Sequence, residues 1–234
     1  MGTASLVLAD ARFPGGGHVH SGGVEEAVAR GLVSDVPSLE AFLLGRLHTA
    51  GLIAAAFAAA ATLLASDARV AQAPLSDARA TQASRAWAEL DAELDARTPS
   101  EAQREASRAQ GRGTLRAVRA AWPSPVLDAL VAVHPRPHHP LLVGAVCGIA
   151  GESAEEAARC VAYLAISGPA SAAVRLLGLD PFQVNAALVR LAPSLDTVVA
   201  GARGPELPAP SAPVLDLMAQ SHVHHHDRMR LFAS

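Results

Sequence analysis

A glycine-rich segment near the amino end, Phe13-Pro-Gly-Gly-Gly-His-Val-His-Ser-Gly-Gly-Val-Glu-Glu26, has the composition of a loop that could hold a phosphate. Backbone amides at the start of a helix bind phosphate oxygens. Two phosphate-binding patterns fail here, because Gly23 replaces the lysine of a P-loop beginning at Gly17, and His20 replaces a glycine of the dinucleotide pattern beginning at Gly15. The alternative is a tight turn in which only glycine can take a positive φ.

Histidines form two groups that could bind a metal. His18 and His20 are two positions apart, so in an extended segment they point to opposite sides, and a shared metal requires the loop to fold back. In Ser221-His-Val-His-His-His-Asp-Arg228, a helix would place His222 and His226 on one face at a chelating spacing. Imidazole suits nickel and zinc. The candidate ligands are His222, His224 and His226, for weak metal binding, with ordinary solvated histidines as the alternative.

Other chemistry is excluded by the residue types. All 19 basic residues are arginines, so a Schiff-base, P-loop or kinase lysine cannot exist. No GxSxG or HExxH motif is present. Cys147 and Cys160 are thirteen residues apart, which predicts buried small apolar residues in a reducing compartment. Acidic residues such as Glu25 and Glu26 in a first helical turn complement the helix dipole without any catalytic role.

Composition sets the class of protein. The chain has 234 residues, 50% of them hydrophobic, which is enough for one domain with a sizeable core. A net charge of -3 and 3% aromatic residues predict no nucleic-acid partner. The longest apolar run, residues 50–65, is shorter than the roughly 20 residues that a bilayer span requires. We therefore expect a soluble, cytoplasmic protein without a membrane segment.

The segments that must position these residues are predicted to be helices. Alanine, leucine, glutamate and arginine dominate, which favours an all-α fold of about eight to ten helices. Pro37 predicts the first turn of a helix that runs to about Ala65. Residues 75–97 have helical spacing of apolar positions. Residues 5–8 fit a short strand or a helical turn equally well.

Helix ends are also marked. Capping boxes are expected at Thr98–Glu101, Ser153–Glu156 and Asp180–Gln183, and Gly178 is a plausible stop. The segment His134–Pro140 is too rich in proline for regular helix, and Ser167-Gly-Pro169 should kink or split the helix around it.

The predicted organisation is one helical domain over residues 1–234. It comprises an amino-terminal segment with the glycine loop (1–23), a proline-rich connector (201–213) and a carboxy-terminal tail (227–234).

Two terminal motifs resemble those of a known family. The segment Phe13-Pro-Gly-Gly-Gly and then Ser21-x-Gly23-Val-Glu25 is similar to the UreF pattern Pro-x-Gly-Gly followed by Ser-x-Gly-Leu-Glu. Ser221-x-x-His224 and then Arg230-Leu-Phe-x-Ser234 are similar to the closing signature of that family. Between them, Arg104, Ser107 and Gly111 match a polar helix pattern.

One more segment is similar to the family pattern, and several residues differ from that pattern. Residues 163–177 resemble the segment that leads to the Val-Lys-Leu-x-Pro stretch of the family. Arg175 stands at the lysine position of that stretch and Gly178 at its proline. Further departures are His18, His20, Gly22 and His225.

The resemblance implies an all-α, dimeric, non-enzymatic accessory protein of urease. It implies binding to UreD (also called UreH) and to the GTPase UreG, and passage of nickel to apo-urease coupled to GTP hydrolysis by UreG. No cofactor would be tightly bound, and nickel would be present only transiently. The alternative is a helical metal- or nucleotide-binding enzyme that uses the glycine loop and the histidines. The expected partner-binding residues are Gly16, Gly17, Ser21, Gly23, Glu25, Arg175, His224, Arg230, Leu231 and Phe232.

Two surfaces are predicted for the partners. The alanine-rich helix near residues 52–64 permits close helix approach, which favours a homodimer that buries apolar helix faces. Leu231 and Phe232 are adjacent large apolar residues in the tail, and a partner groove could bury them. We therefore expect residues 229–234 to dock on UreD, with Arg230 contributing forked hydrogen bonds.

Overall fold

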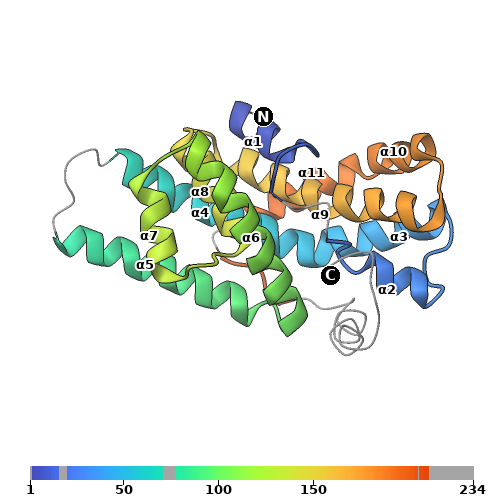
Figure 1. The fold of residues 1–234 in the computed structure, drawn as a ribbon, viewed down its shortest axis with the longest axis horizontal. Helices are drawn as coiled ribbons and strands as arrows, with labels where there is room; N and C mark the ends of the chain where they lie inside the picture. The colour runs from blue at the N-terminus through green and yellow to red at the C-terminus, as the bar shows by residue number, and fades with distance from the viewer. Residues whose placement is uncertain (1, 16–19, 71–76, 205, 211–234) are drawn as a thin grey trace.

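The computed structural model describes residues 2–15, 20–70, 77–204 and 206–210, and its regular elements are helices (Figure 1). The helices are α1 (Thr3–Ala9), α2 (Val24–Ala29), α3 (Val36–Arg46), α4 (Leu52–Val70), α5 (Asp77–Ala96), α6 (Glu101–Ala121), α7 (Pro125–Val133), α8 (His139–Ile149), α9 (Ala154–Leu177), α10 (Pro181–Arg190) and α11 (Ala192–Ala202). A π-helical turn, Leu47–Gly51, joins α3 to α4 in one continuous helix, which makes ten helices in the described chain. The all-α prediction is confirmed.

Local sequence signals explain several helix boundaries. The side chain of Asp35 accepts from the Ser38 amide at 2.9 Å, and α3 begins with proline in its first turn. Ser153 and Glu156 form the predicted capping box of α9, and Gly178, at φ 66°, ends that helix. Asp180 caps α10 by accepting from the amide of Phe182.

Other boundary predictions were wrong in detail. The cap of α6 is Ser100 and not Thr98, because the Ser100 hydroxyl is the group that accepts from the amide of Gln103. For residues 5–8, where a strand and a helical turn were equally expected, the helical alternative is the correct one, since they lie within α1. The helix after Pro37 continues through the π-helical turn to Val70. The segment ending at Pro140 is irregular only to residue 138, because proline is tolerated in the first turn of α8.

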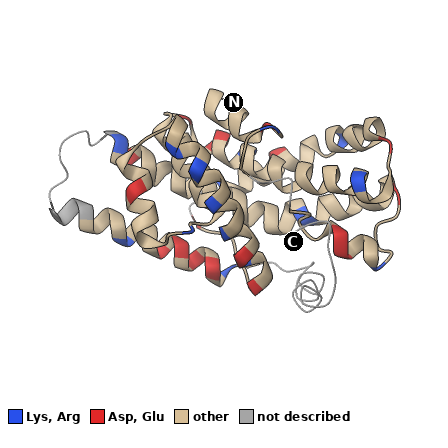
Figure 2. Ribbon diagram, in the orientation of Figure 1, with Lys and Arg blue, Asp and Glu red and all other residues tan. Residues whose placement is uncertain are grey.

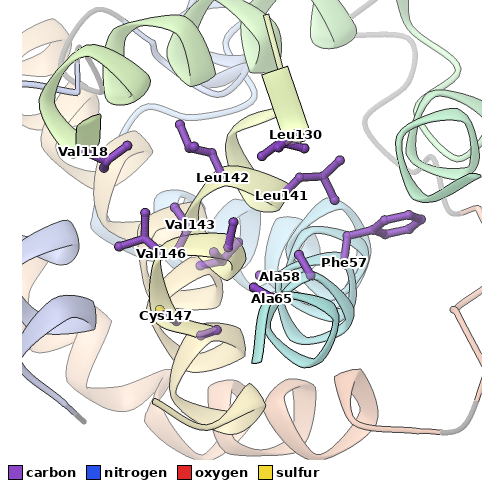
Figure 3. Packing of buried hydrophobic residues seen from close by; sticks show 14 of the residues in the cluster. Phe57, Ala58, Ala65, Val118, Leu130, Leu141, Leu142, Val143, Val146 and Cys147 are labelled. Carbon is purple, nitrogen blue, oxygen red and sulfur yellow. The ribbon is translucent and has the colours of Figure 1, made fainter. Parts of the chain in front are cut away.

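The core is built around α4, which lies against α8, α9, α11 and α5 (Figures 1 and 3). Glycines allow α8 to approach α4 closely. A Cβ on Gly144 would overlap the carbonyl oxygen of Ala58, and one on Gly148 would lie 2.5 Å from the carbonyl oxygen of Thr62. The Thr62 hydroxyl donates to Gly144 O at 3.1 Å across this contact.

This packing corrects the surface expected for a dimer. The alanines of α4 at positions 55, 56, 58, 59, 61 and 65 are buried inside the chain, as is Phe57. Their small side chains are used for intramolecular contact with α8 and α9, so this face is not available to a second copy. Cys147 and Cys160 are buried in the same core and form no disulfide, as predicted.

Among the described residues with charged side chains, Asp91 and Arg108 are the ones that are buried. Acidic residues gather along α5 and the start of α6 (Figure 2). The first two residues of the predicted connector (201–213), Gly201 and Ala202, belong to α11, whereas the described residues 203–204 and 206–210 are not helical.

Candidate partner-binding site

The glycine turn before α2 docks on α9. Ser21 is buried, and Gly22 and Gly23 have φ values of 61° and 89°, which only glycine adopts at low cost. A Cβ on Gly22 would lie 2.8 Å from Pro169 Cγ and 3.0 Å from Arg46 Cζ. Glycine is therefore required at position 22 for its backbone conformation and for the close approach of the loop to α9.

Pro169 lies inside α9 without splitting it, so of the kink or split predicted around Ser167-Gly-Pro169 the split is absent. Proline has no N–H, and the carbonyl of Ala165, four residues earlier, therefore loses its helical donor. The Nε of Arg46 donates to this carbonyl at 2.8 Å. A side chain from α3 thus replaces the missing backbone bond and allows the helix to continue.

The guanidinium of Arg46 is unusual in its surroundings. Burial lowers the pKa of Arg46 to about 10, so it stays protonated at neutral pH. Its Nη1 is buried and has no hydrogen-bond partner. Among the described residues, no carboxylate forms an ion pair with Arg46.

A cavity of about 650 Å³ opens beside this turn. Its walls come from the amino-terminal segment, α3, α6 and α9, and include His20, Gly23, Arg46, Thr114, Pro169 and Arg175. Thr114 is buried, and its hydroxyl has no hydrogen-bond partner. His139 also lines the cavity, and burial, reinforced by the nearby His20, lowers its pKa to about 4.

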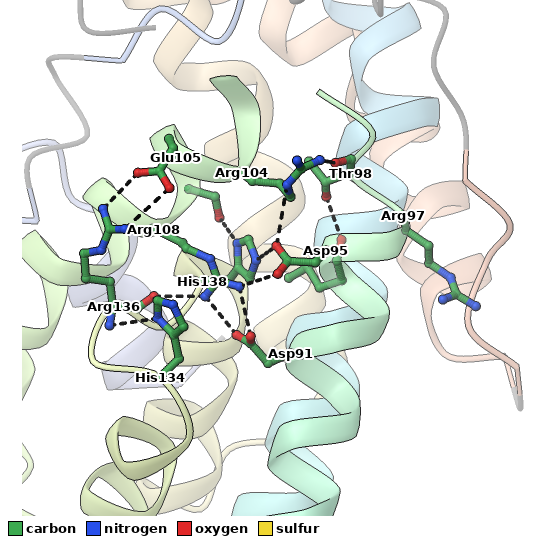
Figure 4. A network of polar contacts seen from close by, with 12 residues as sticks. Asp91, Asp95, Arg97, Thr98, Arg104, Glu105, Arg108, His134, Arg136 and His138 are labelled. Carbon is green, nitrogen blue, oxygen red and sulfur yellow. Dashed lines mark hydrogen bonds and ion pairs between the residues drawn. The ribbon is translucent and has the colours of Figure 1, made fainter. Parts of the chain in front are cut away.

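A second group of polar side chains joins α5, α6 and the segment before α8 (Figure 4). Arg108 donates from Nη1 to Asp91 at 3.1 Å and from Nη2 to Asp91 and Asp95 at 2.9 and 2.7 Å. Its Nη1 also donates to the carbonyl of Arg136 at 3.1 Å. Burial opposes the charge of Arg108, but the two carboxylates outweigh it and raise the pKa of Arg108.

His138 is fully buried in this network. Its Nε2 lies 2.8 Å from Asp95 Oδ1, and its Nδ1 lies 3.0 Å from the hydroxyl of Ser107. Burial and the Arg108 charge lower the pKa of His138 against the opposing effect of Asp95. The neutral ring therefore donates from Nε2 and accepts from Ser107 at Nδ1.

The polar pattern on α6 forms one wall of this network. Arg104 donates to the carbonyls of Thr98 and Pro99 at 2.8 and 2.9 Å, and these bonds hold the turn between α5 and α6. A Cβ on Gly111 would overlap the carbonyl oxygen of Pro137. Of the three residues matched in the sequence, Ser107 and Gly111 therefore contact the segment before α8, and Arg104 holds the connection between α5 and α6.

The predicted partner-binding residues are only partly within the described chain. Gly23 and Arg175 line the cavity, Ser21 is buried in the turn, and Glu25 lies in the first turn of α2. Arg175 is exposed, and its Nε donates to the carbonyl of Ser171. Gly16, Gly17, His18, His222, His224, His225, His226, Arg230, Leu231 and Phe232 lie outside the described residues.

Several residues of the site were not predicted. Arg46 carried no motif, although Pro169 within a helical segment signals that another donor must reach Ala165. Asp91, Asp95 and Arg108 were missed because acidic and basic residues are frequent along those helices.

Within the described ranges, no three His, Cys, Asp or Glu side chains are grouped as a metal site.

Two described helices have the length and hydropathy of membrane spans. They are Val36–Arg69 and Ala154–Leu177, and 61% and 44% of their most apolar windows are buried inside the protein. Core helices of globular proteins have the same character, so these two helices are weak evidence for a membrane segment.

The sequence of this chain is similar to those of known urease accessory proteins. The UreF family model matches residues 33–192. A urease accessory protein UreF of Mycobacterium sp. (strain JLS) is 46% identical over 227 residues, which cover 94% of this chain and 93% of the relative. Proteins of the same name from Mycolicibacterium vanbaalenii and Mycobacterium marinum are each 44% identical, with 98% of this chain and 97% of the relative covered.

Proposed function

The chain belongs to the UreF family of urease accessory proteins, and from this premise we propose that it is the scaffold that joins UreD (UreH) and the GTPase UreG during nickel insertion into apo-urease. The observation that carries the proposal is the similarity along nearly the whole chain to proteins named urease accessory protein UreF. These relatives are accessory proteins and not enzymes, which favours the scaffold over the alternative of a metal- or nucleotide-binding enzyme.

The geometry of the glycine turn supports a role in presenting a partner surface. Gly22 and Gly23 fix the point at which the chain enters α2, and the docked turn sets the position of that helix on α9. Glu25 and its helix would then face a partner in a defined orientation. Replacing Gly16 or Gly17 by valine should reduce urease activation while the helical content is preserved.

The central experiment is a pull-down with UreD and UreG from the same source. Full-length protein should retain both partners and should support urease activation only when they are present. A catalytic turnover by the purified chain alone would contradict the scaffold. The addition of GTP should change urease activation only in mixtures that contain UreG.

The carboxy-terminal tail is proposed to dock on UreD. Removing residues 229–234 should leave a folded helical protein that no longer binds UreD, and Arg230→Ala should cause a milder loss. Leu231 and Phe232 would be buried in the UreD groove, each contributing about 1.5–3 kcal/mol to binding. Capture of UreD by the truncated protein at the full-length level would rule out this role.

The scaffold is proposed to act as a homodimer. Because the alanines of α4 are buried within the chain, the dimer must use another face. Phe182 and Val189 are 84% and 67% exposed and lie seven residues apart on α10, which places them on one side of the helix. The double change Phe182→Ser and Val189→Ser should convert dimer to monomer in light scattering, whereas Leu63→Ser, an exposed change on α4, should not.

Nickel is proposed to bind this chain only weakly when it is alone. A carrier that holds nickel tightly cannot release it, and the candidate ligands His222, His224 and His226 have one nearby carboxylate in sequence, Asp227. Calorimetry should give no one-to-one site tighter than micromolar. A tighter site that disappears in the His222→Ala, His226→Ala variant would contradict this expectation. Localisation in the cytoplasm is part of the same proposal.

A further inference from the structure

Two arginines have guanidinium nitrogens that are buried in the protein, and their charges are compensated very differently. Arg108 is buried as a whole residue, whereas Arg46 is half-buried and its Nη1 is the enclosed atom. Arg108 forms hydrogen bonds and ion pairs with the carboxylates of Asp91 and Asp95. Arg46 donates only to the neutral carbonyl of Ala165. Of the carboxylates in the described chain, none forms an ion pair with Arg46, and its buried Nη1 has no acceptor.

An uncompensated buried cation is costly. Charges inside proteins are normally paired, because the loss of hydration is repaid only by an opposite charge and well-placed hydrogen bonds. Burial lowers the pKa of Arg46 to about 10, with no carboxylate to oppose the shift, yet the group remains protonated at neutral pH. Among the described residues, no negative charge therefore stabilises the charged guanidinium of Arg46.

The cavity provides room for such a charge. Arg46 lines a space of about 650 Å³, which lies within the roughly 300–1,000 Å³ range of small-molecule sites. Most of the neighbouring wall residues are apolar, among them Ile53, Leu164, Pro169 and Leu188. A fully buried hydroxyl, that of Thr114, also lines the cavity and has no hydrogen-bond partner.

We propose that this cavity binds a small molecule that carries one carboxylate on an apolar body, with Arg46 as the anchor of the carboxylate. The apolar walls would contact the body of the ligand, and the carboxylate would accept from the guanidinium, including the Nη1 that lacks an acceptor. The hydroxyl of Thr114 would contribute a second polar contact within the same cavity. This inference does not depend on the partners proposed above, since it concerns the isolated chain.

A second arginine beside the cavity, Arg97, lacks this character. Arg97 also lines the cavity, but it forms an ion pair with Glu93 and donates to the carbonyl of Pro208 at 2.7 Å. Its charge is already balanced, so it should not attract a second carboxylate. Arg97→Gln is therefore the matched control for Arg46→Gln.

Calorimetry with the full-length chain tests the proposal, with octanoate as the probe and octanamide as its neutral equivalent. Octanoate should bind about tenfold or more tightly than octanamide, because a charge-assisted hydrogen bond in a buried site is worth at least that ratio. Arg46→Gln should reduce octanoate binding to the octanamide level, and Arg46→Lys, which keeps the charge, should retain part of the preference. Arg97→Gln should bind octanoate as the unmodified chain does.

A second measurement keeps the test decisive if Arg46→Gln does not fold. In protein labelled with ¹⁵N-arginine, octanoate should shift the Nε–H signal of Arg46, identified through the Arg46→Lys variant, whereas octanamide should not. Equal binding of octanoate and octanamide, the absence of octanoate binding, or an unchanged Arg46 signal would each overturn the proposal. Failure to capture UreD or UreG in the pull-down would count against the scaffold function and would leave this result intact.

Discussion

The Nε of Arg46 and the carbonyl oxygen of Ala165 are 2.8 Å apart and join α3 to the one place in α9 where a backbone bond is missing. Pro169 removes the donor that would normally reach this carbonyl. The arginine therefore compensates for a proline 123 residues further along the chain. The backbone of Gly22 packs against the same arginine side chain.

Arg46 and Pro169 should be energetically coupled. Arg46→Met should destabilise the protein by about 1–3 kcal/mol, because it leaves the part-buried Ala165 carbonyl without a donor. In a Pro169→Ala background, the new backbone N–H can serve that carbonyl, and the cost of Arg46→Met should fall by about 1 kcal/mol. Urea unfolding of the two single variants and the double variant measures this difference, and additive costs would contradict the coupling.

The sequence predicted the helical fold because its signals were local. The capping box at Ser153, the stop at Gly178 and the proline in the first turn of α3 depend on neighbouring residues only, and each was confirmed. A split of the helix was one of the two outcomes predicted at Pro169, and it does not occur because the compensating donor comes from a distant helix. The contact between Gly144 and Ala58 could not be predicted either, since alanine-rich segments do not identify their partners.

The candidate site shows the same limit. The motif Ser21-x-Gly23 marked the turn correctly, because the left-handed backbone there requires glycine. Nothing in the motif indicated that the turn would lie on Arg46, or that α5 and α6 would share a buried ion pair. Long-range pairs of this kind depend on how helices pack.

Gly22→Ala should destabilise the docked turn more than a comparable change elsewhere. Gly31 is the matched control, since it also has a positive φ, of 71°, but a Cβ added there would have nothing within 4 Å of it. Gly31→Ala should cost about 1 kcal/mol for backbone strain alone. Gly22→Ala should cost about 1–3 kcal/mol more, because its Cβ meets Pro169 and Arg46. Equal losses in thermal or urea unfolding would show that the contact is unimportant.

Gly144→Ala should disrupt the contact between α8 and α4. Its added Cβ would overlap the backbone of Ala58, which cannot move without displacing the helix, so the free energy of unfolding should fall by at least about 1–3 kcal/mol. Gly45→Ala is the control, because this glycine of α3 has open space around it and alanine favours helix by about 1 kcal/mol. Circular dichroism melts should show opposite shifts for the two variants.

Arg108→Met should be among the most damaging single changes. It leaves the buried Asp91 without a cation, and breaking a buried pair in this way costs about 3–5 kcal/mol. Asp95 keeps its longer ion pair with Arg104 and its hydrogen bond with His138. Arg119→Met removes an exposed ion pair with Asp128 and should change stability by no more than about 1 kcal/mol. Unfolding curves that place the two variants close together would argue against a structural role for the network.

The stability of the protein should fall as the pH is lowered from about 6.5 towards 4, and His139 should account for part of the loss. In the unfolded chain a histidine takes up a proton near pH 6.5. In the folded protein, burial and the nearby His20 lower the pKa of His139 to about 4, so between these values only the unfolded state binds this proton. The stabilisation is therefore complete above about pH 6.5 and decreases as the pH falls through the window, with a slope of at most about 1.4 kcal/mol per pH unit for one proton.

His138, whose pKa is also lowered by burial, adds to the slope in the same direction. Carboxylates with lowered pKa, such as Asp35 and Glu40, lose their contribution only at lower pH, below their ordinary values of 3.8 and 4.5.

His139→Gln removes this titration while keeping a polar side chain at the cavity wall. Urea unfolding at intervals between pH 4.5 and 7.5 should give a shallower dependence on pH for His139→Gln than for the unmodified chain, with the two curves converging in slope above about pH 7. His48→Gln is the matched control, because His48 is an exposed histidine of the π-helical turn. If His139→Gln and the unmodified chain lose stability in parallel across this window, His139 takes up its proton at the same pH in the folded and unfolded states, and the prediction is wrong.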